Sequence, residues 1–223
     1  MGWPERFEGW TAATGRPGSE AHLQLEAARR SVSSNSAEDW QWLSQALDDV
    51  KRKVFVALVF EHQPVPKRLL AAFLRAALLE PDPSRNRMFV EPCVRSWGSG
   101  EVNRRLLHYL QEGTNEEKAG AASAFYWAQG NPRNEDLDEL RSAIRCALLH
   151  EFVCNTDLRV RQRIAPLLNL DQAAYGVHDH PLIAQAIALA RSHPDEYIRH
   201  RIEIQLGGDG PFRSIPVTHS DAA

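Results

Sequence analysis

The fold is decided by two stretches that repeat at an offset of 38 residues, from residue 155 to residue 193. Asn155–Ile164 reads Asn-Thr-Asp-Leu-Arg-Val-Arg-Gln-Arg-Ile, and His193–Ile202 reads His-Pro-Asp-Glu-Tyr-Ile-Arg-His-Arg-Ile. When the two are aligned, an aspartate, a branched aliphatic residue, two arginines and an isoleucine coincide. An aspartate before an apolar-periodic run is typical of a helix N-cap. The alignment therefore predicts two equivalent helices, each opening a copy of one structural unit.

Weaker copies extend this pattern toward the N-terminus. Candidate entries lie at residues 49, 82, 115, 157 and 195, so the intervals between them are 33, 33, 42 and 38 residues. At the entry near residue 82, Arg85 takes the place that Val160 has in the clear copy. Each interval has room for one pair of helices. A helix pair buries its apolar stripe only against neighbouring pairs, so the copies are expected to stack.

Apolar residues recur at three- and four-residue spacing through most of the chain, as helices require, and no stretch alternates like a strand. Short breaks rich in glycine, proline and capping residues separate the apolar stripes. Residues 1–18 and 207–223 lack the spacing, so we expect an irregular N-terminal segment packed on the first helices and a C-terminal tail. The predicted helices are 19–32, 37–61, 67–79, 84–96, 101–112, 116–129, 135–153, 157–168, 180–191 and 195–206.

The composition fits an all-α protein and narrows the classes of partner. The chain has 223 residues, of which 43% are apolar, and a net charge of -3. Alanine and leucine, which enter helices at little cost, are the commonest residues. The near-neutral charge gives no basis for a general nucleic-acid or membrane-surface binder. The longest apolar run, residues 54–60, is too short to span a membrane. Three cysteines without a CxxC motif and the lack of a signal peptide predict a cytoplasmic protein with no membrane contact.

The repeated stretches resemble HEAT repeats, in which the second helix of each pair opens with an aspartate followed by a Val-Arg pair. The resemblance implies a right-handed α-solenoid of about five helix pairs, forming a single domain over residues 1–206. In that family the aspartates and arginines form a ladder between neighbouring repeats. The residues to which the resemblance gives this structural role are Asp157, Arg161, Asp195 and Arg199.

No sequence motif indicates catalysis. The chain has no glycine-rich phosphate loop, no GxSxG, no HExxH and no paired-cysteine zinc signature. His178, Asp179 and His180 carry groups that bind metals, but no further ligand stands at a set spacing from them. We therefore predict no metal, no cofactor and no catalytic residue.

Stacked helix pairs expose a continuous helical face, commonly concave, on which a partner can dock. Arginine binds carboxylates through two parallel hydrogen bonds, and arginine and aromatic residues are enriched at interfaces. We therefore predict a non-catalytic scaffold that binds a partner protein or an acidic peptide. The residues expected to line this face are Lys53, Arg87, Tyr126, Arg159, Arg163 and Arg201.

The same arginines leave an alternative open. HEAT-like DNA glycosylases use tryptophan and aspartate in a basic groove, and residues 125–127, Phe-Tyr-Trp, together with Arg159, Arg163 and Arg201 resemble such a groove. On that interpretation the chain is a nucleic-acid-binding module or a glycosylase-type enzyme. Duplex binding gains much of its affinity by neutralising phosphates, so the net charge of -3 favours the scaffold.

Overall fold

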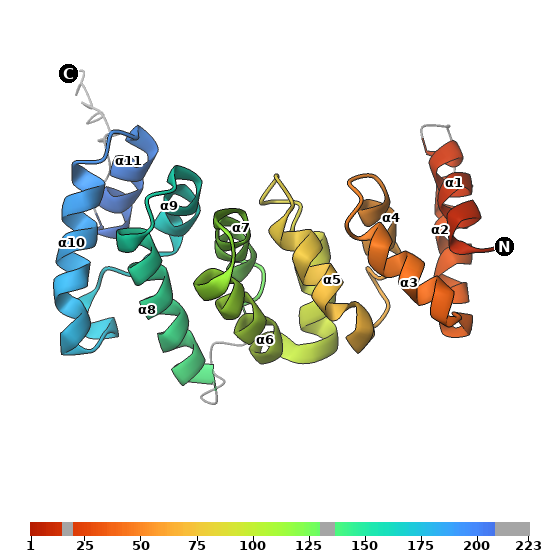
Figure 1. The fold of residues 1–223 in the computed structure, drawn as a ribbon, viewed down its shortest axis with the longest axis horizontal. Helices are drawn as coiled ribbons and strands as arrows, with labels where there is room; N and C mark the ends of the chain where they lie inside the picture. Colours follow the sequence, from red (N-terminus) through yellow and green to blue (C-terminus); the bar gives the residue numbers. More distant parts are fainter. Residues whose placement is uncertain (15–19, 130–136, 208–223) are drawn as a thin grey trace, which may run out of the picture. The chain divides into compact units, whose positions relative to one another are not determined.

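The structure is a computed structural model in which residues 1–14, 20–129 and 137–207 are described. Within these ranges the chain forms eleven α-helices and several 3-10 turns, and no strand (Figure 1). The prediction of an all-α fold is confirmed. The chain divides into two compact units, residues 1–140 and residues 141–223, which are described separately. The single domain expected over residues 1–206 stays a prediction.

Unit 1 contains the first seven helices. The predicted helix over residues 37–61 is two helices, because the Asp49 carboxylate accepts hydrogen bonds from the backbone N–H groups of Lys51 and Arg52, both at 2.9 Å, and so starts a new helix. The helices are α1 (Trp3–Ala13), α2 (Glu20–Ser31), α3 (Ala37–Ala46), α4 (Arg52–Val59), α5 (Lys67–Leu78), α6 (Arg87–Glu112) and α7 (Asn115–Phe125).

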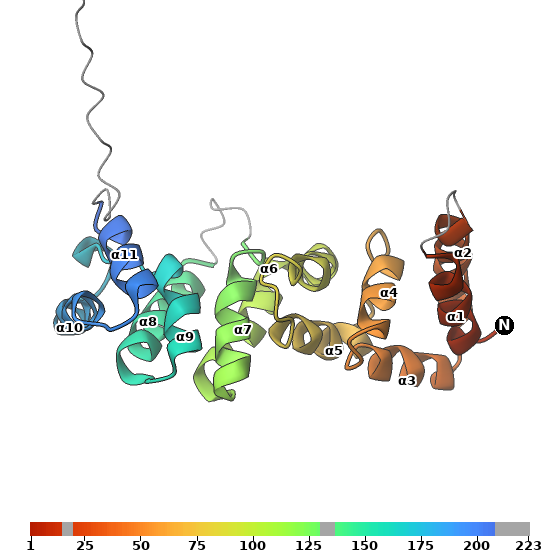
Figure 2. The ribbon, with the colours of Figure 1, turned by 90° about the horizontal axis from the view of Figure 1, so that it is seen from above.

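The first segment of the chain is helical, so the prediction of an irregular N-terminal segment is wrong. Trp3, Phe7 and Trp10 stand at four- and three-residue spacing and share one face of α1. Trp3 is buried, and the rings of Phe7 and Trp10 lie 5.8 and 5.4 Å from that of Phe55 in α4. Helices α1 and α2 lie side by side (Figures 1 and 2). The aromatic face of α1 thus packs against Phe55 of α4.

Small residues let α7 approach α5 closely. A Cβ atom on Gly120 would lie 2.1 Å from the carbonyl oxygen of Leu78, a distance that no side chain tolerates. The residues that flank this glycine in α7 are short and buried, namely Ala119, Ala121 and Ala122. These short side chains allow α7 to pack directly on the end of α5.

Helix α6 replaces two predicted helices, 84–96 and 101–112. Between the two predicted helices, α6 is kinked at Gly98, whose φ of 78° and ψ of 155° are not helical. This backbone conformation is open essentially to glycine alone. Pro92 lies within the first half of α6 without ending the helix. The kink divides α6 into a half before Gly98, which contributes to the pocket described below, and a half after it.

Unit 2 contains α8 (Asp138–Cys154), α9 (Leu158–Ile164), α10 (His180–Arg191) and α11 (Glu196–Gln205). The aspartates of the repeated stretches cap α9 and α11 as predicted. Asp157 accepts a hydrogen bond from the backbone N–H of Val160 at 2.9 Å, and Asp195 accepts one from that of Ile198 at 3.0 Å. The 38-residue repeat is thus a repeat of helix starts.

The arginines of the repeated stretches do not form the expected Asp–Arg ladder. Arg161 donates hydrogen bonds to the carbonyl oxygens of Phe152 and Val153, at 3.1 and 3.3 Å. Arg199 donates to the carbonyl oxygens of His193 and Pro194, at 2.5 and 2.8 Å. Backbone carbonyls at the end of one segment carry partial negative charge, and the guanidinium that follows in the next helix satisfies them.

The link between the two copies is instead an amide–carboxylate contact. Gln162 in α9 donates to the side chain of Asp195 at 3.1 Å, so the residue that caps α11 also holds α9. Gln205 donates to the carbonyl oxygen of Pro166 at 2.8 Å from the other end of α11. The ladder is therefore corrected to one polar contact at each end of α11.

The C-terminal tail expected over residues 207–223 falls almost wholly outside the described residues. Gly207 ends the chain that is described and has a φ of 78° just after α11, which is the predicted closing position of the last helix. Among the described helices, none has the length and apolar character needed to cross a membrane.

Candidate functional site

A pocket of about 450 Å³ opens in unit 1 between α4 and the first half of α6. This volume lies in the range of small ligand sites and accommodates a few side chains. Its apolar lining consists of Ala57 and Leu58 from α4 with Met88 and Pro92 from α6. Its polar lining consists of Glu61, Ser84, Arg85, Arg87, Glu91 and Arg95. The site thus combines an apolar surface with three guanidinium groups and two carboxylates.

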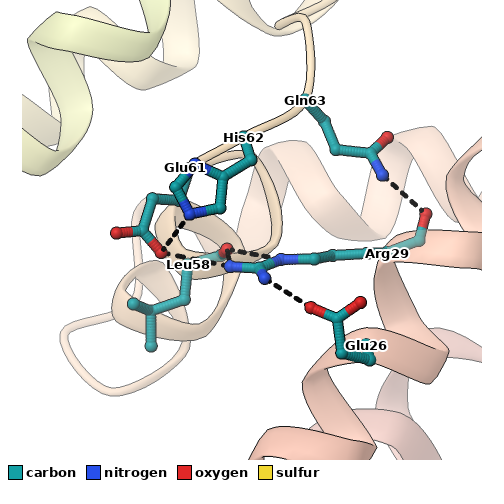
Figure 3. Close-up of polar contacts among 6 residues, drawn as sticks. All are labelled: Glu26, Arg29, Leu58, Glu61, His62 and Gln63. Carbon is teal, nitrogen blue, oxygen red and sulfur yellow. Dashed lines mark hydrogen bonds and ion pairs between the residues drawn. The ribbon is translucent and has the colours of Figure 1, made fainter.

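The wall that α4 contributes is held by Arg29 of α2 (Figure 3). Its guanidinium donates to the carbonyl oxygen of Leu58 through Nη2 at 2.8 Å and Nε at 3.3 Å. It also pairs with Glu26 at 2.6 Å and with Glu61 at 3.1 Å. The Arg29 side chain is only 10% exposed. Because helix C-termini favour cations, Arg29 both ends α4 and positions Glu61 at the pocket.

Two further contacts fasten the same wall. Gln63 donates to the carbonyl oxygen of Arg29 at 3.2 Å, which ties the segment after α4 back to α2. Arg95, on α6, donates to the backbone carbonyl of Glu61. The end of α4 is therefore held by α2 on one side and by α6 on the other. The pocket between α4 and α6 is pre-formed as a result.

The opposite rim is a short turn before α6. Asp82 accepts hydrogen bonds from Ser84, at 2.9 Å from its backbone N–H and 2.7 Å from its hydroxyl. These bonds hold the pKa of the Asp82 carboxyl below its usual value. Residue 82 was a candidate entry of the repeat, but α6 begins only at Arg87. The Asp82 turn instead presents Arg85 at the edge of the pocket.

Two of the predicted binding residues, Arg87 and Tyr126, both contact a third residue, Trp127, near this rim. Arg87 pairs with Glu91 at 2.7 Å, and its guanidinium carbon lies 5.4 Å from the ring centroid of Trp127. The Tyr126 ring packs edge-on against Trp127 at 4.8 Å and is 61% exposed. Trp127 itself is fixed by a hydrogen bond from its Nε1 to the carbonyl oxygen of Pro83 at 3.1 Å. Arg87 and Tyr126 therefore belong to one surface.

Arg85 differs from the other pocket arginines because its guanidinium has no hydrogen-bond or ion-pair partner among the described residues. Sequence reasoning passed over it as a flaw in a degenerate repeat. The sequence alignment places Arg85 where the clear copy has the apolar Val160, and that departure from the pattern was the available signal. In the structure Arg85 precedes α6, so it does not take the helical position that Val160 has in α9. Trp127 was singled out only in the nucleic-acid alternative, and Arg95 gave no comparable signal.

Lys53 does not line an exposed face, which corrects its prediction as a binding residue. Its side chain is buried, and its ammonium group pairs with the buried carboxylate of Glu80 at 2.8 Å. The ammonium also lies 5.5 Å from the ring centroid of Phe89. A buried charge is stable only with such a partner, so the role of Lys53 is structural.

The other predicted binding residues belong to unit 2. Arg159 is exposed on α9, and Arg163 is half-buried on the same helix. Arg201 on α11 donates to the hydroxyl of Tyr197 at 3.3 Å and lies over its ring. That these three arginines share a face with Arg87 and Tyr126 stays a prediction.

Two observations on the described residues concern metal binding and thiol reactivity. No group of three or more histidine, cysteine, aspartate or glutamate side chains that could hold a metal occurs within the described ranges. Burial raises the pKa of the Cys93 thiol to about 12. Burial and the nearby Asp179 carboxylate raise the pKa of Cys146. A raised thiol pKa disfavours the reactive thiolate, so neither cysteine is activated as a nucleophile.

No protein-family model matches this sequence, and neither a curated protein nor a solved structure matches it significantly. The resemblance to HEAT repeats therefore remains an expectation from the residues quoted above.

Proposed function

We propose that the protein is a non-catalytic interaction scaffold, and that the pocket between α4 and α6 binds an acidic segment of a partner protein. The observation that carries the proposal is Arg85, an exposed guanidinium at the pocket edge that lacks a partner in the described part of the chain. Arginine forms strong, geometrically specific pairs with carboxylates. An acidic side chain of a partner would supply the missing counter-ion.

The rigidity of the pocket supports the same proposal. Its α4 wall is fixed by Arg29 and Arg95, and its aromatic rim by the hydrogen bond of Trp127. A pre-formed site pays less entropy on binding than a flexible one. Arginine and aromatic residues gathered around an apolar centre are also the composition of energetically dominant interface residues.

We also propose that the helices stack as a right-handed α-solenoid of about five pairs. Polar contacts between successive helix pairs support this arrangement because they recur at about the repeat length. Arg29 reaches Leu58, Trp97 donates to Val65 at 2.8 Å, and Gln205 reaches Pro166. Each side chain thus satisfies a loop or helix-end carbonyl roughly one pair away.

Nucleic acid is the second candidate, and the exposed Tyr126 beside Arg87 is the observation in its favour. An exposed aromatic ring next to a cation is a platform on which a base can stack. However, Glu61 and Glu91 line the same pocket and would repel the successive phosphates of a nucleic acid, whereas a peptide can place one carboxylate at Arg85 and no second charge near the glutamates. The peptide is therefore the better match to the charges of the site.

Fluorescence anisotropy with labelled probes and the full chain tests the proposal. The probes are a twelve-residue peptide of mixed aspartate, leucine and serine, its asparagine analogue, and a twelve-nucleotide single strand of DNA. We expect the acidic peptide to bind best and the Arg85→Glu variant to weaken it about tenfold or more, because an interfacial charge pair becomes a like-charge contact.

The matched control is Lys67→Glu, the same charge change at an exposed position of unit 1 that does not line the pocket. It should leave the affinity unchanged. Equal binding of the acidic and asparagine peptides, or equal losses in the two variants, would contradict the proposal. Binding of DNA that Arg85→Glu abolishes, without peptide binding, would support the nucleic-acid alternative.

A further inference from the structure

We infer that the partner segment presents a single carboxylate next to a bulky apolar side chain, and not a run of acidic residues. This inference rests on the proposed function and concerns which acidic segment the pocket selects.

The cations of the pocket are mostly committed within the protein. Arg87 is paired with Glu91 at 2.7 Å, and Arg95 donates to the backbone carbonyl of Glu61. Arg29, behind the wall, is shared among Leu58, Glu26 and Glu61. Arg85 alone among the arginines that line the pocket has no partner in the described ranges. One uncommitted guanidinium matches one carboxylate.

The carboxylates of the pocket oppose a second acid. Glu61 pairs with Arg29 at 3.1 Å and Glu91 with Arg87 at 2.7 Å, but the two side chains are 51% and 35% exposed, so both carboxylates still lie at the pocket surface. A ligand with several adjacent acids would bring some of them toward these two glutamates. Like charges brought together at an interface cost affinity and so exclude wrong partners.

The apolar part of the pocket lining favours binding of an apolar side chain of the partner. Ala57 and Pro92 are buried, and Leu58 and Met88 are half-buried, so part of the apolar surface of the last two faces the cavity. Methionine adapts its shape to the group packed against it. A cavity of about 450 Å³ has room for a leucine or phenylalanine side chain beside the carboxylate that reaches Arg85. Charge and apolar fit therefore select the pair together.

Four fluorescein-labelled Gly-Ser peptides of equal length test the inference by anisotropy with the full chain. Their centres carry Asp-Leu, Asp-Ser, Asn-Leu or four consecutive aspartates. We expect Asp-Leu to bind tightest, with each single replacement costing about tenfold, which is the order of one buried aliphatic side chain or one charge pair. The four-aspartate peptide should bind no better than Asp-Ser.

Two variants locate the two halves of the motif. Met88→Ala should weaken Asp-Leu by several-fold and leave Asp-Ser unchanged, because it removes only apolar lining. Arg85→Glu should abolish binding of the Asp-Leu peptide. The same variant should bind a fifth peptide, with Lys-Leu at its centre, more tightly than it binds Asp-Leu. A merely structural role for Arg85 would not produce that reversal. Circular dichroism melting of each variant confirms that it is folded.

The outcomes separate this inference from the proposed function. If the four-aspartate peptide binds tightest and Arg85→Glu abolishes its binding, the inference is wrong and the acidic-partner function stands. If none of the acidic peptides binds, or if Arg85→Glu changes no affinity, both are wrong.

Discussion

In unit 2, Arg161 and Arg199 direct their guanidinium groups to backbone carbonyls, whereas Arg85 in unit 1 is exposed beside a pocket with no partner in the described ranges. The unit 2 arginines carry the clear repeat signature, and they stabilise helix ends. Arg85 lies where the signature is degenerate. The difference teaches that the clear repeat marks residues that hold the fold, whereas the candidate binding residue Arg85 lies where the repeat is degenerate.

The largest effect is expected where a cation is buried. Lys53→Ala leaves the Glu80 carboxylate buried without its partner, so we expect a loss of about 3–5 kcal/mol in the free energy of unfolding. Urea denaturation measures it. The double variant Lys53→Met with Glu80→Leu replaces both charges by apolar groups and should lose far less. If Lys53→Ala were as stable as the parent, the buried Lys53–Glu80 pair would contribute no more to stability than an exposed ion pair.

The repeat arginine should come next, and its neighbour supplies the control. Arg161→Ala removes hydrogen bonds to Phe152 and Val153, and we expect a loss of about 1.5–3 kcal/mol because charged donors are involved. Arg159→Ala, on the exposed face of the same helix, should change stability by less than about 0.5 kcal/mol. Equal losses in urea denaturation would remove the distinction between structural and surface arginines in unit 2.

A capping carboxylate should have a smaller effect, and one that depends on pH. Hydrogen bonds from Thr114 lower the pKa of Glu117 in the folded chain. The ionised group therefore stabilises the fold above its unfolded pKa, and the contribution is lost as pH falls through the lower folded pKa. Glu117→Ala should cost about 1 kcal/mol at pH 7 and less as the medium is acidified below about pH 4.

Glu116→Ala is the matched control, since Glu116 lies in the same first turn outside the capping box. Thermal unfolding across pH compares the two variants. A Glu117→Ala loss that is constant from pH 7 to pH 3 would show that the capping charge is irrelevant.

The exposed ion pair of unit 2 should matter least. Arg191 and Glu203 pair at 2.7 Å, but their side chains are 57% and 36% exposed. Water screens such pairs, so a double-mutant cycle with Arg191→Ala and Glu203→Ala should give a coupling of about 0–1 kcal/mol that decreases in high salt. A coupling near that of Lys53 and Glu80 would overturn the argument that burial sets the rank.

Local signals were predictable from the sequence. The capping aspartates Asp157 and Asp195 and most helix spans follow from residues adjacent in the chain. Trp3, Phe7 and Trp10 also stand at helical spacing. Three aromatic residues in a short segment with proline and glycine nearby are a weak helix signal, so the sequence predicted irregular structure there.

The candidate site was only partly predictable because it forms between segments distant in sequence. Arg87 and Tyr126 were expected at a surface, but their meeting depends on Trp127 reaching back to Pro83. Lys53 was expected to be exposed because lysine usually is. Its burial depends on a carboxylate that lies far from it in the sequence and is brought to it only by tertiary packing.

The kink at Gly98 provides a way to recognise relatives of this chain that does not depend on the pocket residues. The backbone angles there strain any residue other than glycine, although the space around the position is open. We expect homologues that keep the pocket half of α6 to retain glycine at this position even where Arg85 or Tyr126 has changed. A search anchored on that glycine would then separate relatives that keep only the fold from relatives that also keep the residues of the candidate site.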